Sequence, residues 1–156
     1  MIQAFLRRLE KMGSMINDPL RDWPGYTLRR LSAALMAKLA IRLAALDLRP
    51  AEATVLLVIG ANPGVTQSEV GRLLDIASAN MTPLAARLTD RALIVRQPVD
   101  RRSQGLKLSE SGRRLMVKAR AIMEELEQDL VERIPAAQRD AFLGSLSKLA
   151  RSVQND

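Results

Sequence analysis

The sequence predicts a mainly α-helical fold with one small β-wing. Apolar residues make up 47% of the 156 residues and aromatic residues only 3%, and the abundance of Leu and Ala favours helices. Most apolar side chains recur at steps of three and four residues, the spacing of one helix face. Residues 93–109 differ, because two β-type segments there flank a short polar turn.

The first third of the chain predicts two amphipathic helices separated by a break. Residues 2–12 carry apolar side chains at helical spacing with basic side chains between them, which predicts a short basic helix. Residues 14–26 interrupt the pattern with Asn, Asp, Pro and Gly. Leucines then step by three and four from Leu28 to Leu46, which predicts a long helix from about residue 26 to 46.

The middle of the chain predicts a buried helix and then two short ones. Pro50 suits the first position of a helix, and residues 53–61 are apolar on nearly every side, so this helix should be buried. After a turn at residues 62–64, Thr66 with a Glu three residues later forms a capping box, and its helix ends near residue 75. Ser78 is expected to cap the next helix, which runs to about Arg91 and holds Pro83 near the end of its first turn. Two short helices this close together make a helix-turn-helix.

The last part predicts a β-hairpin and two further helices. The strands cover residues 93–99 and 105–109, and at least one of Leu106 and Leu108 should lie in the core. A helix from about 110 to 133 follows with a coiled-coil-like apolar seam. Pro135 opens a final helix that is apolar on one face.

A hairpin directly after a helix-turn-helix is a wing. In such proteins the second helix enters the major groove of DNA, and the wing reaches the flanking backbone or the minor groove. The charge agrees, because residues 87–107 hold six basic and two acidic side chains, whereas residues 114–156 are balanced. The whole chain carries a formal charge of +7. These features predict a protein that binds double-stranded DNA.

The stretch from Leu48 to Leu115 resembles the MarR family of winged-helix transcriptional regulators. The family's wing pattern is matched by Asp100, Arg102, Leu106, Leu108, Ser109 and Gly112, and the end of its recognition helix by Arg87, Leu88 and Leu93. Ala92 stands where the family usually has Gly, and Pro83 is less usual. The resemblance implies a homodimer acting on a pseudo-palindromic operator, most often as a repressor.

The resemblance also implies a domain organisation. Residues 1–47 would form an N-terminal arm and the first dimerisation helix, 48–112 the DNA-binding domain, and 113–156 the C-terminal dimerisation helices of one compact protomer. An intramolecular helical bundle is the alternative to a dimer. The expected dimerisation residues are Leu126, Leu130, Phe142, Leu146 and Leu149.

The second helix of the pair holds the candidates for reading bases. Asn80 can pair with adenine, and Thr82 or Met81 can touch a thymine methyl group. Ser78 serves equally as a plain N-cap, and Met81 equally as a core residue. Arg87 suits the phosphate backbone. The expected DNA-binding residues of this helix are Ser78, Asn80, Met81, Thr82, Ala85 and Arg87.

Two other segments complete the expected DNA interface. In the wing, Arg102 is expected in the minor groove with Asp100 orienting its guanidinium, and Arg101 at a phosphate. A solvated turn with an incidental ion pair is the alternative. The start of the first helix of the pair, whose exposed N–H groups suit a phosphate, contributes Thr66, Gln67 and Ser68.

MarR-like proteins commonly bind a small anionic aromatic molecule, and one segment suits such a ligand. Trp23 and Tyr26, the only Trp and the only Tyr, lie beside Arg29 and Arg30, and this combination can receive an aromatic carboxylate. The alternative is that the aromatic side chains pack within the protein and the arginines face solvent. With no Cys in the chain, thiol oxidation is excluded as a trigger.

The composition argues against catalysis. The chain has no Cys and no His, which excludes disulfides, zinc sites with those ligands and His-based acid–base chemistry. We therefore expect no enzyme activity, cofactor or metal. No apolar run approaches a membrane span and no signal peptide is evident, so a cytoplasmic location is expected. The alternative functions are a ligand-independent architectural DNA-binding protein and an adaptor that uses the 2–12 helix.

Overall fold

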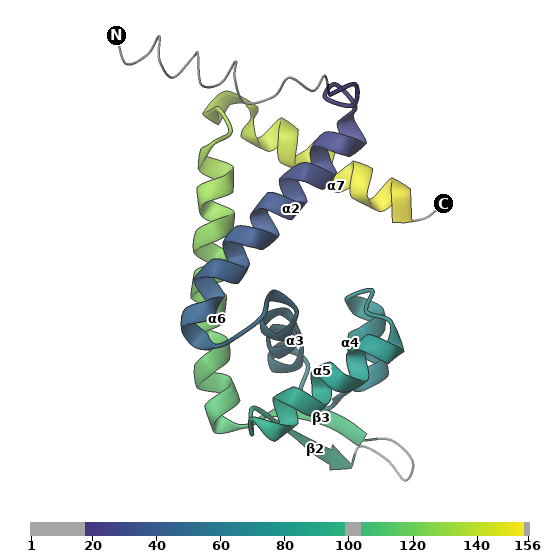
Figure 1. Ribbon diagram of the computed structural model, residues 1–156, viewed down its shortest axis with the longest axis vertical. Coiled ribbons are helices and arrows are strands. Elements are labelled where there is room, and N and C mark those ends of the chain that lie inside the picture. Colours follow the sequence, from purple (N-terminus) through teal and green to yellow (C-terminus); the bar gives the residue numbers. More distant parts are fainter. Residues whose placement is uncertain (1–17, 99–103, 155–156) are drawn as a thin grey trace. The chain divides into compact units, whose positions relative to one another are not determined.

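The computed structural model describes residues 18–98 and 104–154 (Figure 1). The predicted 2–12 helix and the tip of the wing, residues 99–103, lie outside the described residues. The chain divides into two compact units, Met1–Ala37 and Lys38–Asp156, and each is described by itself below.

The predicted fold class, mainly helical with a small β-wing, is confirmed. Within the described residues no helix is long and apolar enough to cross a membrane. The helices are α2 (Pro24–Leu43), α3 (Pro50–Ala61), α4 (Gln67–Leu73), α5 (Ser78–Asp90), α6 (Glu110–Glu132) and α7 (Arg139–Gln154), with 3₁₀ turns at Ala44–Leu46 and Ala136–Gln138. The strands are β1 (Val65–Thr66), β2 (Ile94–Pro98) and β3 (Gln104–Leu108).

Helix α3 forms the centre of the second unit. It begins with Pro50 at its first position, as predicted, and it packs against α6 and β3 (Figure 1). Most of its large apolar side chains are buried or half-buried. Val55, Leu56 and Ile59 are fully buried, and each such side chain stabilises the fold by roughly 1.5–3 kcal/mol relative to an exposed one. The expectation of a buried helix is confirmed.

The sheet holds one strand more than the sequence predicts. The three strands are antiparallel in the order β1-β3-β2, with Val65 opposite Leu106 in one pair and Ile94 opposite Leu108 in the other. Strand β1 has two residues, which is too short to produce a periodic pattern. Because β1 pairs with β3, it connects the start of α4 to the wing. Leu106 and Leu108 of β3 are both buried.

Among the described residues, the apolar face of helix α7 is exposed. From residue 140 to residue 153 every side chain of this helix is exposed, although apolar side chains recur along it at steps of three and four. Phe142 is 44% exposed and Leu149 is 48% exposed. On α6, Leu126 is instead buried within the protomer and Leu130 is half-buried.

Candidate DNA-binding interface

Helix α4 starts with the capping box that the sequence predicts. The hydroxyl of Thr66 accepts a hydrogen bond of 3.3 Å from the backbone N–H of Glu69, and Oε2 of Glu69 accepts from the backbone N–H of Thr66 at 2.8 Å. The Thr66 hydroxyl also donates to the same carboxylate at 2.7 Å. These bonds lower the pKa of Glu69, first through the backbone and then through the side chain of Thr66. The Thr66 side chain is therefore engaged within the cap.

A tight turn fixes α5 against α4. Asp75 has a left-handed backbone conformation with φ of 53°, and the N–H of Ile76 donates to the carbonyl of Gly71 at 2.8 Å. A Cβ atom at Gly71 would lie 3.1 Å from the carbonyl oxygen of Ile76, so a larger residue would crowd the turn. The predicted helix-turn-helix is confirmed, and its second helix is held in place by the backbone of the turn.

The N-cap of helix α5 lies one residue before the residue expected to cap it. Ala77 occupies the N-cap position and makes no side-chain cap bond, whereas Ser78 is the first helical residue. The prediction that Ser78 caps this helix is therefore wrong. Its side chain is exposed in the first turn together with that of Asn80.

Two of the residues predicted to bind DNA are instead buried in the core. Met81 is 2% exposed and Ala85 is fully buried, on the same face as Leu84 and Leu88. Their packing holds α5 onto the domain and leaves no surface for a base. We therefore leave Met81 and Ala85 out of the interface proposed below.

A chain of side-chain hydrogen bonds joins α4, α5 and β2. The amide of Gln67 donates to the Thr82 hydroxyl at 3.1 Å and accepts from the Arg96 guanidinium at 3.2 Å. The Thr82 hydroxyl in turn donates to the carbonyl of Ser78 at 3.1 Å. Gln67 and Thr82 were predicted from the sequence as site residues. Arg96 was not, because its place beside them depends on the sheet.

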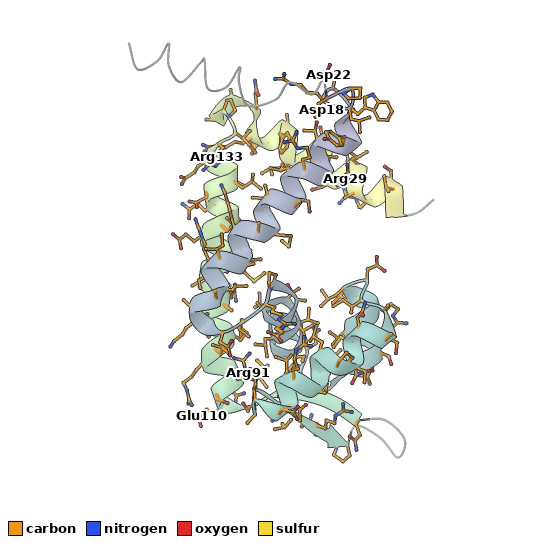
Figure 2. All side chains as sticks on the ribbon, viewed as in Figure 1. Asp18, Asp22, Arg29, Arg91, Glu110 and Arg133 are labelled. Atoms are coloured by element: carbon orange, nitrogen blue, oxygen red, sulfur yellow. The ribbon has the colours of Figure 1, made fainter. Side chains whose placement is uncertain are left out.

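A buried carboxylate organises the other end of α5. Nε of Arg87 lies 3.1 Å from Oε1 of Glu52, and Oε2 of Glu52 accepts from the backbone N–H of Arg49 at 2.9 Å. Arg91, which follows α5 (Figure 2), donates to the backbone carbonyl of Asp47 at 2.7 Å. An open cavity of about 430 Å³ borders this group of side chains. Glu52 was not among the residues predicted from the sequence, although an acidic residue in an otherwise apolar helix is a signal that could have indicated it.

The turn before the wing keeps its shape without the usual glycine. Ala92 has φ of 52°, in the left-handed region. Its carbonyl accepts hydrogen bonds from the hydroxyls of Ser109 at 2.7 Å and Ser111 at 2.8 Å. Ser109 is also the N-cap of α6 and accepts from the N–H of Gly112 at 2.9 Å. Ser109 and Gly112, which match the family pattern, together with Ser111 thus fix the start of α6 against this turn.

The wing contributes exposed cations on its described strands. Arg96 on β2 and Lys107 on β3 are both exposed. Asp100, Arg101 and Arg102, which were predicted to contact DNA, lie outside the described residues.

The first unit brings together three of the four candidate ligand-binding residues. The guanidinium carbons of Arg29 and Arg30 lie 5.2 and 5.7 Å from the centre of the Tyr26 ring. Asp18, which precedes α2 (Figure 2), accepts a 3.3 Å hydrogen bond from the Tyr26 hydroxyl and lies 3.6 Å from Arg30. Trp23 is 62% exposed. The carboxylate of Asp18 therefore contacts the same Tyr26 and Arg30 side chains that the sequence predicts for the carboxylate of a ligand.

The described residues offer no metal centre. They contain no group of three or more Asp and Glu side chains placed to hold a metal ion. The acidic side chains of α6 instead pair along or beside the helix, as Glu124 does with Arg120 at 2.6 Å and Asp129 with Arg42 at 2.6 Å.

Comparison with known sequences relates this geometry to transcriptional regulators. The sequence model of the MarR family matches residues 46–103. The chain is 28% identical over 143 residues to a Thauera aromatica protein named for transcriptional regulation of the hcr operon, with 90% of this chain and 86% of that protein covered. It is 27% identical over 140 residues to the HTH-type transcriptional repressor Rv2887 of Mycobacterium tuberculosis, with 88% and 98% covered.

Solved structures show the same similarity. The transcriptional repressor CouR bound to a 23-mer DNA duplex is 33% identical, with a TM-score of 0.77 and coverage of 88% of this chain and 99% of that one. CouR bound to p-coumaroyl-CoA has a TM-score of 0.79 at 31% identity, with the same coverage. The complex of Rv2887 with p-aminosalicylic acid has a TM-score of 0.67 at 27% identity and covers 81% of this chain and 98% of that one.

Proposed function

The chain belongs to the MarR family of transcriptional regulators, and on this premise we propose that it represses transcription as a homodimer bound to a pseudo-palindromic operator. The observation that carries the proposal is the position of α5. Buried Leu84 and Leu88 hold one side of this helix on the domain, and the opposite side is exposed beside the wing cation Arg96. A helix presented in this way fits the major groove.

The side chains divide into groups by their surroundings. Ser78, Asn80 and Thr82 are exposed at the start of α5 and are proposed to face base edges. Arg87, whose guanidinium contacts Glu52, is proposed to hold α5 rather than to bind phosphate. The flanking backbone would be contacted by Gln67, Ser68, Arg96 and Lys107, together with Arg101 of the wing. Arg102 would enter the minor groove with Asp100 orienting its guanidinium. Thr66, whose N–H and hydroxyl are bonded to Glu69, would hold the start of α4 at the backbone.

The homodimer is supported by α7. A helix that is exposed along its length and carries Phe142, Leu146 and Leu149 on one face requires a partner for that face, since large exposed apolar patches are unfavourable in water. A second copy of the chain supplies a matching helix by two-fold symmetry. Leu126 is already buried and would support the interface from within the protomer, with Leu130 beside it.

The proposal includes a small-molecule effector that modulates DNA binding. CouR and Rv2887 have been solved with p-coumaroyl-CoA and p-aminosalicylic acid respectively, and both ligands are aromatic. In this chain Tyr26, Arg29 and Arg30 lie together beside the exposed Trp23. An aromatic carboxylate would displace Asp18 from Arg30 and weaken DNA binding.

In vitro selection of genomic fragments at near-physiological salt tests the regulator directly. We expect a motif with two inverted half-sites about one helical turn, ~34 Å, apart. Sedimentation of the complex would show two chains per site. Salt-sensitive binding without a recovered motif would contradict sequence-specific regulation and favour an architectural protein.

The wing is tested separately with the selected duplex. Arg102→Ala should weaken DNA binding and lower the slope of log affinity against log salt by about one unit. Arg133→Ala, at the residue that follows α6 and outside the proposed interface, is the matched control. An unchanged affinity would reject the role of Arg102.

A further inference from the structure

The outward face of α5 is apolar at its centre. Ala79, Pro83 and Ala86 are all exposed and are spaced by four and three residues, so they form one stripe on the helix. The buried residues Leu84 and Leu88 lie on the opposite side. This stripe, here called the α5 stripe, is therefore the part of the helix that faces away from the core of the domain.

The polar side chains bordering the α5 stripe are partly committed within the protein. The hydroxyl proton of Thr82 is donated to Ser78 and the amide of Gln67 is shared between Thr82 and Arg96. Asn80 is exposed at one edge of the stripe and keeps an amide able to pair with adenine.

The one cation of α5 is held at Glu52. Arg87 is the sole Lys or Arg between residues 78 and 90, and its Nε lies 3.1 Å from the buried carboxylate. Bidentate recognition of guanine requires a free Arg or Lys aimed at the base. Helix α5 therefore lacks the usual means of selecting guanine.

The apolar feature that the major groove offers is the C5-methyl group of a pyrimidine. We propose that the α5 stripe binds such methyl groups, and that each half-site is consequently read through thymine methyls by Ala79, Pro83 and Ala86 and through adenine by Asn80. The inference rests on the proposed function, since it assumes that α5 enters the major groove.

The test replaces thymine by deoxyuridine, one position at a time, in the duplex recovered by selection. This change removes a methyl group and leaves every hydrogen-bonding atom in place. Affinity measured by fluorescence anisotropy should fall about fourfold for each methyl that the stripe buries, the value for one methyl-sized group. The same thymine·adenine pair is also replaced by 5-methylcytosine·guanine or by cytosine·guanine. The duplex with 5-methylcytosine should bind more tightly than the duplex with cytosine, and this comparison separates the effect of the methyl group from that of the base that carries it.

Variants of the stripe assign each methyl group to a side chain. Pro83→Ala removes most of the ring and keeps the helix, and Ala86→Ser places a hydroxyl in the contact. In each variant we expect the deoxyuridine penalty to shrink at one position and to persist elsewhere. Ala121→Ser, at an exposed position of α6, is the matched control and should leave all penalties unchanged. Thermal unfolding verifies that each variant is folded.

Three results would overturn the proposal. A recovered motif whose deoxyuridine duplexes bind as well as the thymine duplexes would refute the inference while the regulator function stands. Penalties that remain unchanged in both stripe variants would assign the methyl contacts to other residues. Binding without any motif would remove the proposed function and the inference with it.

Discussion

Arg87 of α5 and Glu52 of α3 form an ion pair that joins these two helices. Nε of Arg87 lies 3.1 Å from Oε1 of Glu52, and among the described residues Glu52 is the one charged side chain that is buried. Its second oxygen accepts from the backbone of Arg49. Because one carboxylate caps α3 and contacts α5, the position of the recognition helix depends on it.

Glu52→Gln should lower the free energy of unfolding by about 1–3 kcal/mol. The substitution leaves Arg87 without an anion, and losing one partner of a buried pair costs more than the pair itself contributes. Arg87 is 43% exposed, so water offsets part of the loss. Urea unfolding followed by circular dichroism measures the change.

Two further variants separate the pair from the general effect of removing a charge. Glu127→Gln makes the same chemical change at an exposed position of α6 and should alter stability little. The double variant Glu52→Gln with Arg87→Gln should lose less than the sum of the single losses. Additive losses would show that the two residues act independently.

Gly112→Ala should destabilise the protein by more than about 3 kcal/mol. A Cβ atom at this position would overlap the backbone carbonyl of Leu93, and backbone atoms cannot move aside without disturbing the turn before the wing. Gly144→Ala is the matched control, because a Cβ atom there meets nothing within 4 Å, and in a helix it should be neutral or stabilising by up to ~1 kcal/mol. Chemical unfolding of both variants tests the difference, and equal stabilities would contradict the close approach.

Local spacing predicted the parts of the fold that depend on neighbours in sequence. The capping box of Thr66 and Glu69 lies within four residues, and the spacing of apolar side chains along residues 110–133 predicted the extent of α6. The buried helix α3 was predictable as well, because its apolar side chains leave no polar face. These features require no knowledge of what lies across the domain.

Features set by tertiary contacts were not predictable in the same way. Helix α5 carries apolar residues on two sides. Its sequence therefore does not show which side faces the core: the side with Met81 and Ala85, or the side with Ala79 and Pro83. Packing on the domain decides it. The short strand β1 exists because β3 pairs with it, and Arg96 meets Gln67 only through that sheet.

Ala92→Gly should stabilise the protein by about 1 kcal/mol. Ala92 has φ of 52°, a conformation that costs an L-residue with a Cβ atom roughly 1–2 kcal/mol and costs glycine nothing. The greater freedom of glycine in the unfolded chain offsets part of the gain. Thermal unfolding measures the result. For comparison, Ala121→Gly in the interior of α6 should lose about 1 kcal/mol, and a loss of similar size at position 92 would show that the left-handed turn carries no strain.

The capping box of α4 should make stability depend on pH in the acid range. Hydrogen bonds from Thr66 lower the pKa of Glu69 below its value in the unfolded chain. The charged carboxylate therefore stabilises the fold above the unfolded pKa, and this contribution is lost as the pH falls through the lowered pKa of the folded state. Glu69→Gln should unfold at a lower temperature than the native chain at neutral pH, and the difference should shrink on acidification. Glu127→Gln, which changes an exposed glutamate outside the cap, corrects for general charge effects. A difference that stays constant between neutral and acid pH would show that the carboxylate charge contributes nothing to the cap.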